Sequence, residues 1–163
     1  MGIFNRKSEN STMEIPAICD VNLERYLGTW YEIARFPHSF EKGLENVTAT
    51  YDLKSDGKIE VINAGFKNRK KSVARGTAWI PDKSCNGRLL VSFFRPFKGE
   101  YKIIKLDKEN YRFAVITGST KNYLWILSRE PKMSEELYND IISFVSSKGF
   151  DTSRIIRVKQ NIN

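Results

Sequence analysis

The fold is decided by three β-forming segments within residues 29–66: TWYEIARF at 29–36, VTATYDL at 47–53 and KIEVINAGF at 58–66. Each is rich in aromatic and β-branched residues and has the length of a single strand. Between the last two segments, Ser55-Asp56-Gly57 is typical of a tight turn. The third segment alternates, with Ile59, Val61 and Asn63 on one face. These features predict neighbouring antiparallel strands.

Five more segments of the same kind follow at roughly even spacing, at residues 73–80, 88–94, 101–106, 111–117 and 123–128. Their connections have the length of hairpin loops, so the eight segments predict an antiparallel meander. Closure into an up-and-down β-barrel is the expected outcome, because closure removes the exposed edges of the sheet. An eight-stranded barrel encloses room for about one small ligand. A two-sheet sandwich is the structural alternative.

The hydrophobic period changes near the end of the chain. Residues 134–148 have the spacing of an amphipathic helix, with Ser134 as its N-cap and Gly149 as its stop. Its apolar stripe consists of Tyr138, Ile141, Ile142 and Val145. The outer wall of the barrel is the only large surface that can bury this stripe, so we expect one C-terminal helix packed outside the barrel. Residues 154–159 predict a short final strand.

The composition limits the classes of function. A chain of 163 residues with 40% hydrophobic and 28% charged residues fits one globular domain. The net charge of +8 favours anionic partners, which include nucleic acid, anionic membranes and anionic small ligands. His38 is the only histidine, which excludes a site with several histidine ligands. We expect no metal and no cofactor.

The two cysteines and the N-terminus bear on the compartment. Cys19 and Cys85 form no Cys-x-x-Cys motif; they could form one disulfide or remain thiols. Two free thiols are the preferred prediction, because nothing marks the chain as exported. Residues 1–11 lack the apolar core of a secretory signal. A lipid-attached cysteine normally follows a small residue, but the residue before Cys19 is Ile18. As written, the sequence predicts a cytoplasmic protein with an N-terminal arm at 1–18.

Two motifs at the ends of the predicted barrel resemble those of the lipocalin family. Gly28-Thr29-Trp30-Tyr31 looks like the Gly-x-Trp-Tyr that begins the first strand, and NYLWILSR at 122–129 is similar to the later motif in which an arginine closes the last strand. With RYLGTWYEIARF at 25–36, the chain most closely resembles bacterial lipocalins, a branch that includes plant temperature-induced lipocalins and apolipoprotein D. The resemblance covers about residues 21–160. It implies a lipocalin domain at 19–160, a tail at 161–163, and a homodimer as an assembly that members of this branch can form. Family members are often outer-membrane or periplasmic proteins, so the resemblance and the missing export signals leave the compartment open.

The resemblance also implies structural roles for three residues. Gly28 permits the close entry of the chain into the first strand. Trp30 closes the barrel floor, and Arg129 lies across that indole in a cation–π contact. We expect these three residues to support the fold and not to contact the ligand.

Strand alternation from these anchors predicts the lining of the barrel. Trp125 lies in the cavity wall and Tyr123 nearer the mouth. The residues predicted to contact a ligand are Ala49, Tyr51, Val61, Asn63, Val91, Phe93, Tyr101, Ile103, Tyr123 and Trp125. Such an apolar, aromatic lining with few polar groups is expected of a lipid pocket. A barrel filled by its own side chains has the same pattern and is the alternative.

The mouth of the barrel is predicted to be basic. Alternate loops of an up-and-down barrel lie at the same end, and the loops after the first, third, fifth and seventh strands hold most of the excess positive charge. The predicted rim residues are Phe36, Phe40, Lys67, Arg69, Lys70, Arg95 and Phe97. A cationic rim over an apolar shaft suits a fatty acid, a lysophospholipid or an anionic membrane surface. A merely solvated loop at 67–71 is the alternative.

We therefore predict a protein that binds and stores or transports a hydrophobic or amphiphilic ligand and is not an enzyme. His38, in a mouth loop, cannot meet Cys85 at the floor, and Ser39 has no oriented base beside it. A basic β-barrel that binds single-stranded nucleic acid is the alternative function. We disfavour nucleic acid as a partner, because the basic residues lie on loops and not in a groove lined by outward aromatic side chains.

Overall fold

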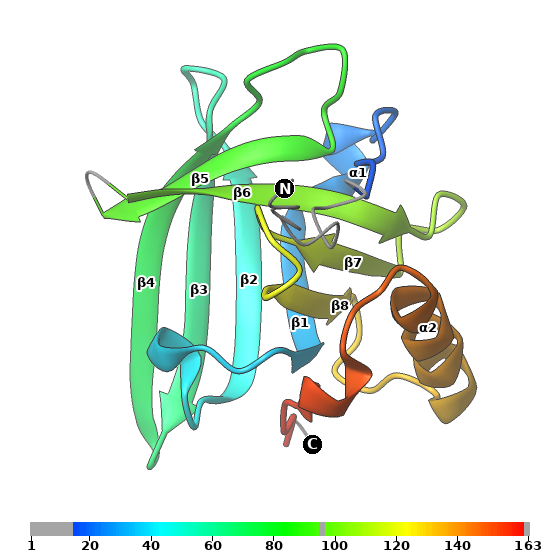
Figure 1. Cartoon of the computed structure of the whole chain (residues 1–163). Coiled ribbons are helices and arrows are strands. Elements are labelled where there is room, and N and C mark those ends of the chain that lie inside the picture. The colour runs from blue at the N-terminus through cyan, green and yellow to red at the C-terminus, as the bar shows by residue number, and fades with distance from the viewer. Residues whose placement is uncertain (1–14, 95–96, 162–163) are drawn as a thin grey trace, which may run out of the picture.

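Eight antiparallel strands close into a barrel in this computed structural model, which describes residues 15–94 and 97–161 (Figure 1). They are β1 Gly28–Arg35, β2 Glu45–Leu53, β3 Ile59–Lys67, β4 Lys70–Trp79, β5 Arg88–Phe94, β6 Phe97–Leu106, β7 Phe113–Thr117 and β8 Leu124–Ser128. Neighbours in sequence are neighbours in the sheet, and β1 pairs with both β2 and β8 to close it. The up-and-down barrel is confirmed, and the sandwich is excluded. A short strand β9, Ile156–Arg157, pairs with the end of β1.

The charged segment at 67–71 is a tight hairpin and not a loop. Lys67 in β3 pairs with Lys70 in β4, and the two residues between them, Asn68 and Arg69, both have a positive φ, at 51° and 65°. Two consecutive left-handed residues are the turn that matches the twist of a hairpin. The charges therefore lie on a rigid strand connection.

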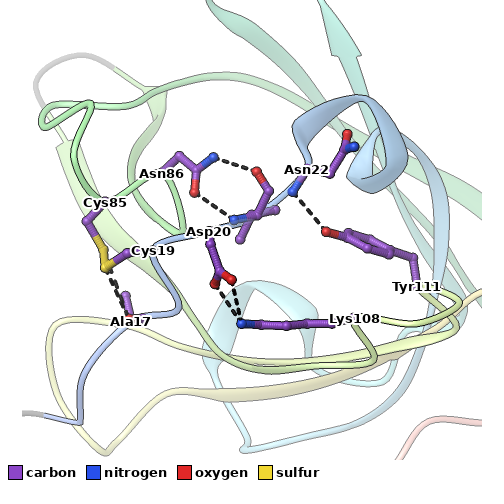
Figure 2. A network of polar contacts seen from close by, with 9 residues as sticks. Ala17, Cys19, Asp20, Asn22, Cys85, Asn86, Lys108 and Tyr111 are labelled. Carbon is purple, nitrogen blue, oxygen red and sulfur yellow. Dashed lines mark hydrogen bonds and ion pairs between the residues drawn. A yellow bond between two sulfur atoms is a disulfide. The ribbon is translucent and has the colours of Figure 1, made fainter.

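The N-terminal segment crosses the floor end of the barrel before α1, Leu23–Tyr26. Ile18 N donates to Ile103 O at 2.8 Å, and the Asn86 side chain accepts from Val21 N at 2.9 Å (Figure 2). At the same end, Lys108 Nζ lies 2.6 Å from Asp20 Oδ1 (Figure 2).

The prediction of two free thiols is wrong, because Cys19 and Cys85 form a disulfide at this end of the barrel (Figure 2). The N-terminal segment brings Cys19 beside the β4–β5 connection, where Cys85 lies. Their sequence separation of 66 residues concealed this proximity.

The helix α2, Glu135–Ser147, packs outside the barrel near β7 and β8 (Figure 1). Ser134 Oγ accepts a hydrogen bond from Leu137 N at 3.2 Å, as expected of its N-cap. Ile141 and Val145 are fully buried against an outer core that includes Val115 and Ile126. Among the described residues, none of the helices is long and apolar enough to span a bilayer.

Candidate ligand-binding site inside the barrel

An indole and a guanidinium close the floor of the barrel. Trp30 is fully buried, and its Nε1 donates to Tyr26 O at 2.8 Å. The Arg129 guanidinium lies 3.8 Å from the centre of the Trp30 ring. Arg129 also donates to four backbone oxygens at the end of α1 and the start of β1: Arg25 (2.6 Å), Leu27 (2.9 Å), Thr29 (3.0 Å) and Tyr26 (3.1 Å). Carbonyls at a helix C-terminus lack partners within the helix, so Arg129 satisfies them.

Gly28 is the point at which the chain turns from α1 into β1. Its φ is +98°, a conformation that side chains strongly disfavour. A Cβ atom there would also lie 3.4 Å from Arg129 Nη1. Since 3.4 Å is an ordinary contact distance, the positive φ and not a lack of space favours glycine at this turn.

The floor half of the barrel is packed with aromatic side chains. The Tyr101 hydroxyl is 2.5 Å from the Tyr26 hydroxyl and donates to the Tyr51 hydroxyl at 2.9 Å. Burial raises the pKa of all three phenols, so they stay neutral in this hydrogen-bonded chain. The remaining void has a volume of about 10 Å³, which is near the lower limit for one water molecule.

In this half of the barrel the interior is filled by the protein's own side chains, which was the alternative to the predicted open shaft. Four of the predicted ligand residues line only the small void: Tyr51, Val91, Tyr101 and Ile103. Aromatic side chains fill the space because α1 contributes Tyr26, which the alternation along the strands does not reveal.

The mouth half contains a cluster of buried charged side chains that the sequence analysis missed. Glu32, Arg35 and Glu41 have only 4%, 4% and 7% of their surfaces exposed. Glu32 lies opposite Leu127, a residue of the interior core, and Arg35 lies opposite Trp125. Opposed residues of an antiparallel pair share a face, so Glu32 and Arg35 both point into the barrel.

A β-bulge explains why alternation did not reveal Arg35. The pairing of β1 with β8 shifts between Glu32 and Ala34. From Trp30, strict alternation would turn Ala34 inward and Arg35 outward. The extra residue reverses this, so Ala34 joins the outer core beneath α2 while Arg35 enters the barrel.

In this cluster one guanidinium stands between two carboxylates. Arg35 Nη2 donates to the backbone oxygen of Glu41 at 2.7 Å, and its Nη1 donates to Glu32 Oε1 at 3.4 Å. Arg35 Nε forms an ion pair with Glu41 Oε2 at 3.4 Å. Burial and the neighbouring charge of Glu41 raise the pKa of Glu32 well above its ordinary value, which favours the protonated acid.

The connection between β1 and β2, residues 36–44, carries Glu41 and lies at the end of the barrel opposite α1 (Figure 1). We call it the mouth loop; it contains the short helical turn η1, Ser39–Glu41. His38 Nε2 lies 3.5 Å from Glu41 Oε1, and its ring packs against Trp125 with centroids 5.6 Å apart. Burial lowers the pKa of His38, so the imidazole is neutral at pH 7. The loop thus places a carboxylate inside the barrel.

The other predicted ligand residues lie at several depths. Ala49 and Val61 are buried in the interior core, and Asn63, Phe93 and Trp125 are half-buried. Tyr123 is 38% exposed and stacks on Trp125, with ring centroids 6.0 Å apart. Phe93, Tyr123 and Trp125 lie toward the mouth ends of β5 and β8, whereas Ala49 and Val61 lie opposite Trp30 and Tyr51 of the floor half.

The predicted rim is only partly at the mouth. Lys67, Arg69 and Lys70 are exposed on the β3–β4 hairpin. Phe36 is not a rim residue: it is 1% exposed and packs against Phe150 in the outer core, because the bulge in β1 also turns it out of the barrel. Arg95 and the side chains of Phe40 and Phe97 lie outside the described part of the structure.

Comparisons with known proteins agree with this geometry. The profile of the lipocalin-like domain matches residues 21–160. The outer membrane lipoprotein Blc of Escherichia coli K12 is 45% identical over 148 residues, which cover 90% of this chain and 83% of that protein. Temperature-induced lipocalin-1 of Arabidopsis thaliana is 36% identical (94% of this chain, 86% of that protein), and apolipoprotein D of Mus musculus is 31% identical (85% and 77%).

Among solved structures, lobster apocrustacyanin A1 matches with a TM-score of 0.70 over 86% of this chain and 81% of that chain. At 17% identity this likeness shows the fold alone. The resemblance to bacterial and plant lipocalins and to apolipoprotein D is confirmed. Lipocalins are generally ligand-binding proteins without enzymatic activity. The fold, the two end motifs and the relatives of this chain show that it belongs to the lipocalin family.

Proposed function

We propose that this protein binds a long-chain amphiphile with an anionic head, a fatty acid or a lysophospholipid, in the mouth half of its barrel, and stores or transports it. The observation that carries this proposal is a barrel closed at one end by Trp30 and Arg129 and lined near the other by Phe93 and Trp125. Each buried methylene contributes about 0.8 kcal/mol, whereas an exposed ion pair at the rim contributes about 0–1 kcal/mol. The tail therefore supplies most of the affinity.

The packed floor makes this proposal testable by chain length. Calorimetric titration with saturated fatty acids of increasing length should show saturable binding near one ligand per barrel or per dimer. Each added methylene should tighten binding about fourfold until the tail reaches the tyrosine cluster, after which the gain should stop. Absence of saturable binding at every chain length would refute the proposal.

Nucleic acid is a second candidate ligand, and one observation favours it. A groove of about 800 Å³ on the outer wall is lined by Trp79 and four cationic side chains: Lys54, Lys58, Arg75 and Lys98. The Lys98 ammonium lies 5.8 Å from the centre of the Trp79 ring. We rank this candidate lower, because surfaces that bind single-stranded nucleic acid stack successive bases on several aromatic rings, and for this groove we rely on one ring, that of Trp79. A salt-sensitive mobility shift with labelled single-stranded DNA, together with no response to fatty acids, would reverse the ranking.

The β3–β4 hairpin supports an anionic membrane surface as a further partner. Phe66 and Val73 are 38% and 46% exposed beside the basic residues Lys67, Arg69, Lys70 and Lys71. Each basic residue near such a surface contributes about 1 kcal/mol. Sedimentation with phosphatidylglycerol vesicles, and not with phosphatidylcholine vesicles, is the expected result. Replacing Lys70 and Lys71 with Gln should reduce the fraction of protein that sediments with the phosphatidylglycerol vesicles.

Compartment and assembly belong to the same proposal. The Cys19–Cys85 disulfide supports a location in an oxidising compartment, as does the name of the bacterial relatives, outer membrane lipoproteins. Trapping of thiols in intact cells should find both cysteines protected, and free thiols would place the protein in the cytoplasm. Native mass spectrometry would test the proposed homodimer and report co-purified lipid at once.

A further inference from the structure

We propose that Arg35 is the receptor for the anionic head of the ligand, and that the Glu41 carboxylate occupies this receptor in the ligand-free barrel. Binding then displaces Glu41 together with the mouth loop that carries it. This inference rests on the proposed function and specifies its polar subsite. It assigns recognition to a buried guanidinium and leaves the exposed lysines of the rim a steering role.

The contact between Arg35 and Glu41 is incomplete. Arg35 Nε and Glu41 Oε2 are both buried and have no hydrogen-bond partner among the described residues, although they lie 3.4 Å apart. A guanidinium presents donors in a planar fork that matches the two oxygens of a carboxylate or a phosphate. In the ligand-free barrel, Arg35 Nη2 binds the backbone oxygen of Glu41 and Arg35 Nε faces one of its side-chain oxygens. A ligand head that approaches along the fork can instead place two oxygens of one anionic group against Nε and Nη2.

Charge balance makes the receptor selective. The guanidinium of Arg35 is buried, and a buried positive charge requires an anion beside it. Burial and the neighbouring Glu41 raise the pKa of Glu32, which favours its neutral form and leaves Glu41 as the counter-ion beside Arg35. A head group that displaces Glu41 must replace its negative charge, so a neutral head of the same size leaves the guanidinium uncompensated.

The location of Glu41 makes it the displaceable partner. Glu32 and Arg35 lie in β1, which is hydrogen-bonded into the sheet, whereas Glu41 lies in the three-residue turn η1 of the mouth loop. Arg35 holds this turn through both the backbone oxygen and the side chain of Glu41. Because the floor is closed, a ligand must enter at the mouth end, where this loop lies. Occupation of Arg35 by a ligand therefore removes one anchor of the loop, although His38 still packs against Trp125.

The test compares three ligands that share one acyl chain: palmitic acid, methyl palmitate and palmitoyl lysophosphatidic acid. The key variant is the charge-balanced pair Arg35→Gln with Glu41→Gln, which removes one positive and one negative charge from the buried cluster. Glu41→Gln alone removes the competing carboxylate. Glu45→Gln is the matched control, since Glu45 is exposed at the start of β2.

In the wild-type protein we expect the acid or the phosphate to bind about tenfold more tightly than the ester, and the double variant should lose this preference. Loss of preference for either anionic head supports the proposal and identifies whether Arg35 takes the carboxylate or the phosphate. Retention of both preferences overturns it. If the ester binds and the wild-type protein shows no preference, the proposed function stands and this inference fails. If no ligand binds, both fail.

Trypsin cleavage after Lys42, an exposed residue of the mouth loop, gives a second readout that does not depend on affinity. Palmitic acid should accelerate cleavage in the wild-type protein, and methyl palmitate should not. Glu41→Gln should cleave faster than wild type without any ligand, while Glu45→Gln should match the wild type. Slower cleavage with palmitic acid, or equal rates for the two variants, would contradict displacement of the loop.

Discussion

Replacement of Arg129 by Met tests how the floor of the barrel is held. Methionine keeps an apolar cover over the Trp30 indole but removes the donors to five backbone oxygens, since Arg129 Nε also donates to Tyr111 O at 3.3 Å. Five hydrogen bonds at about 0.5–1 kcal/mol each amount to about 2.5–5 kcal/mol. Loss of the cation–π contact at 3.8 Å adds about 0.5–1 kcal/mol. We therefore expect a loss of about 3–6 kcal/mol, a large part of the stability of a typical domain.

Guanidinium chloride unfolding, followed by tryptophan fluorescence, measures this loss. Arg129→Lys should fall between wild type and Arg129→Met, because an ammonium keeps the charge but lacks the planar fork. Arg112→Met is the control: Arg112 is exposed and its ion pair with Asp107 is 3.5 Å long, so the change should cost less than about 0.5 kcal/mol. If Arg129→Met costs no more than Arg112→Met, the floor is not held by Arg129.

Three further predictions concern other parts of the barrel. Reduction of the Cys19–Cys85 disulfide, or Cys85→Ser, should lower the free energy of unfolding by up to about 4 kcal/mol, because the bond closes a 66-residue loop. Denaturant unfolding with and without reductant measures this loss, and identical unfolding curves would contradict the prediction. The raised pKa of Glu32 means that the folded state keeps a proton which the unfolded state releases, so stability should fall as the pH rises from about 4.5 toward the folded pKa. Glu32→Gln should flatten this dependence of the free energy of unfolding on pH. An unchanged dependence would assign it to another group. Ile141→Ala should cost about 2–5 kcal/mol if α2 is an integral part of the fold, whereas a cost below about 1 kcal/mol would mean that the helix docks weakly.

Alternation along the strands predicted much of the interior, because β2 and β3 pair without irregularity over the residues concerned. Ala49 and Tyr51 are buried in the interior core, as are Ile59 and Val61. The outer face of β2 (Thr48, Thr50 and Asp52) is polar, so a period of two suffices to orient the side chains of this strand. Its regular pairing with β3 gives β3 the matching orientation.

Prediction failed where the backbone departs from that period. The bulge in β1 turned Arg35 inward and Phe36 outward, and a bulge leaves no reliable mark in a single sequence. The disulfide and the packed floor were missed for a different reason. Both depend on contacts across the floor, between Cys19 and Cys85 and between Tyr26 and Tyr101, that no local pattern encodes.

The signal for the charged cluster was present but ambiguous. Glu32 follows Trp30 by two residues, so alternation alone placed a carboxylate inside the barrel. A buried carboxylate requires a partner, and this requirement points to a nearby arginine. Arg35 was the available cation on the same strand, although only the bulge brings it to the same face.

Quenching by dibromostearic acid tests the central claim, that an acyl chain binds in the mouth half of the barrel. The three tryptophans lie in different places: Trp30 at the closed floor, Trp79 on the outer wall and Trp125 in the mouth wall. We predict saturable quenching that Trp79→Phe leaves intact and Trp125→Phe abolishes. Quenching that disappears with Trp79→Phe and survives Trp125→Phe would place the lipid outside the barrel and contradict the account.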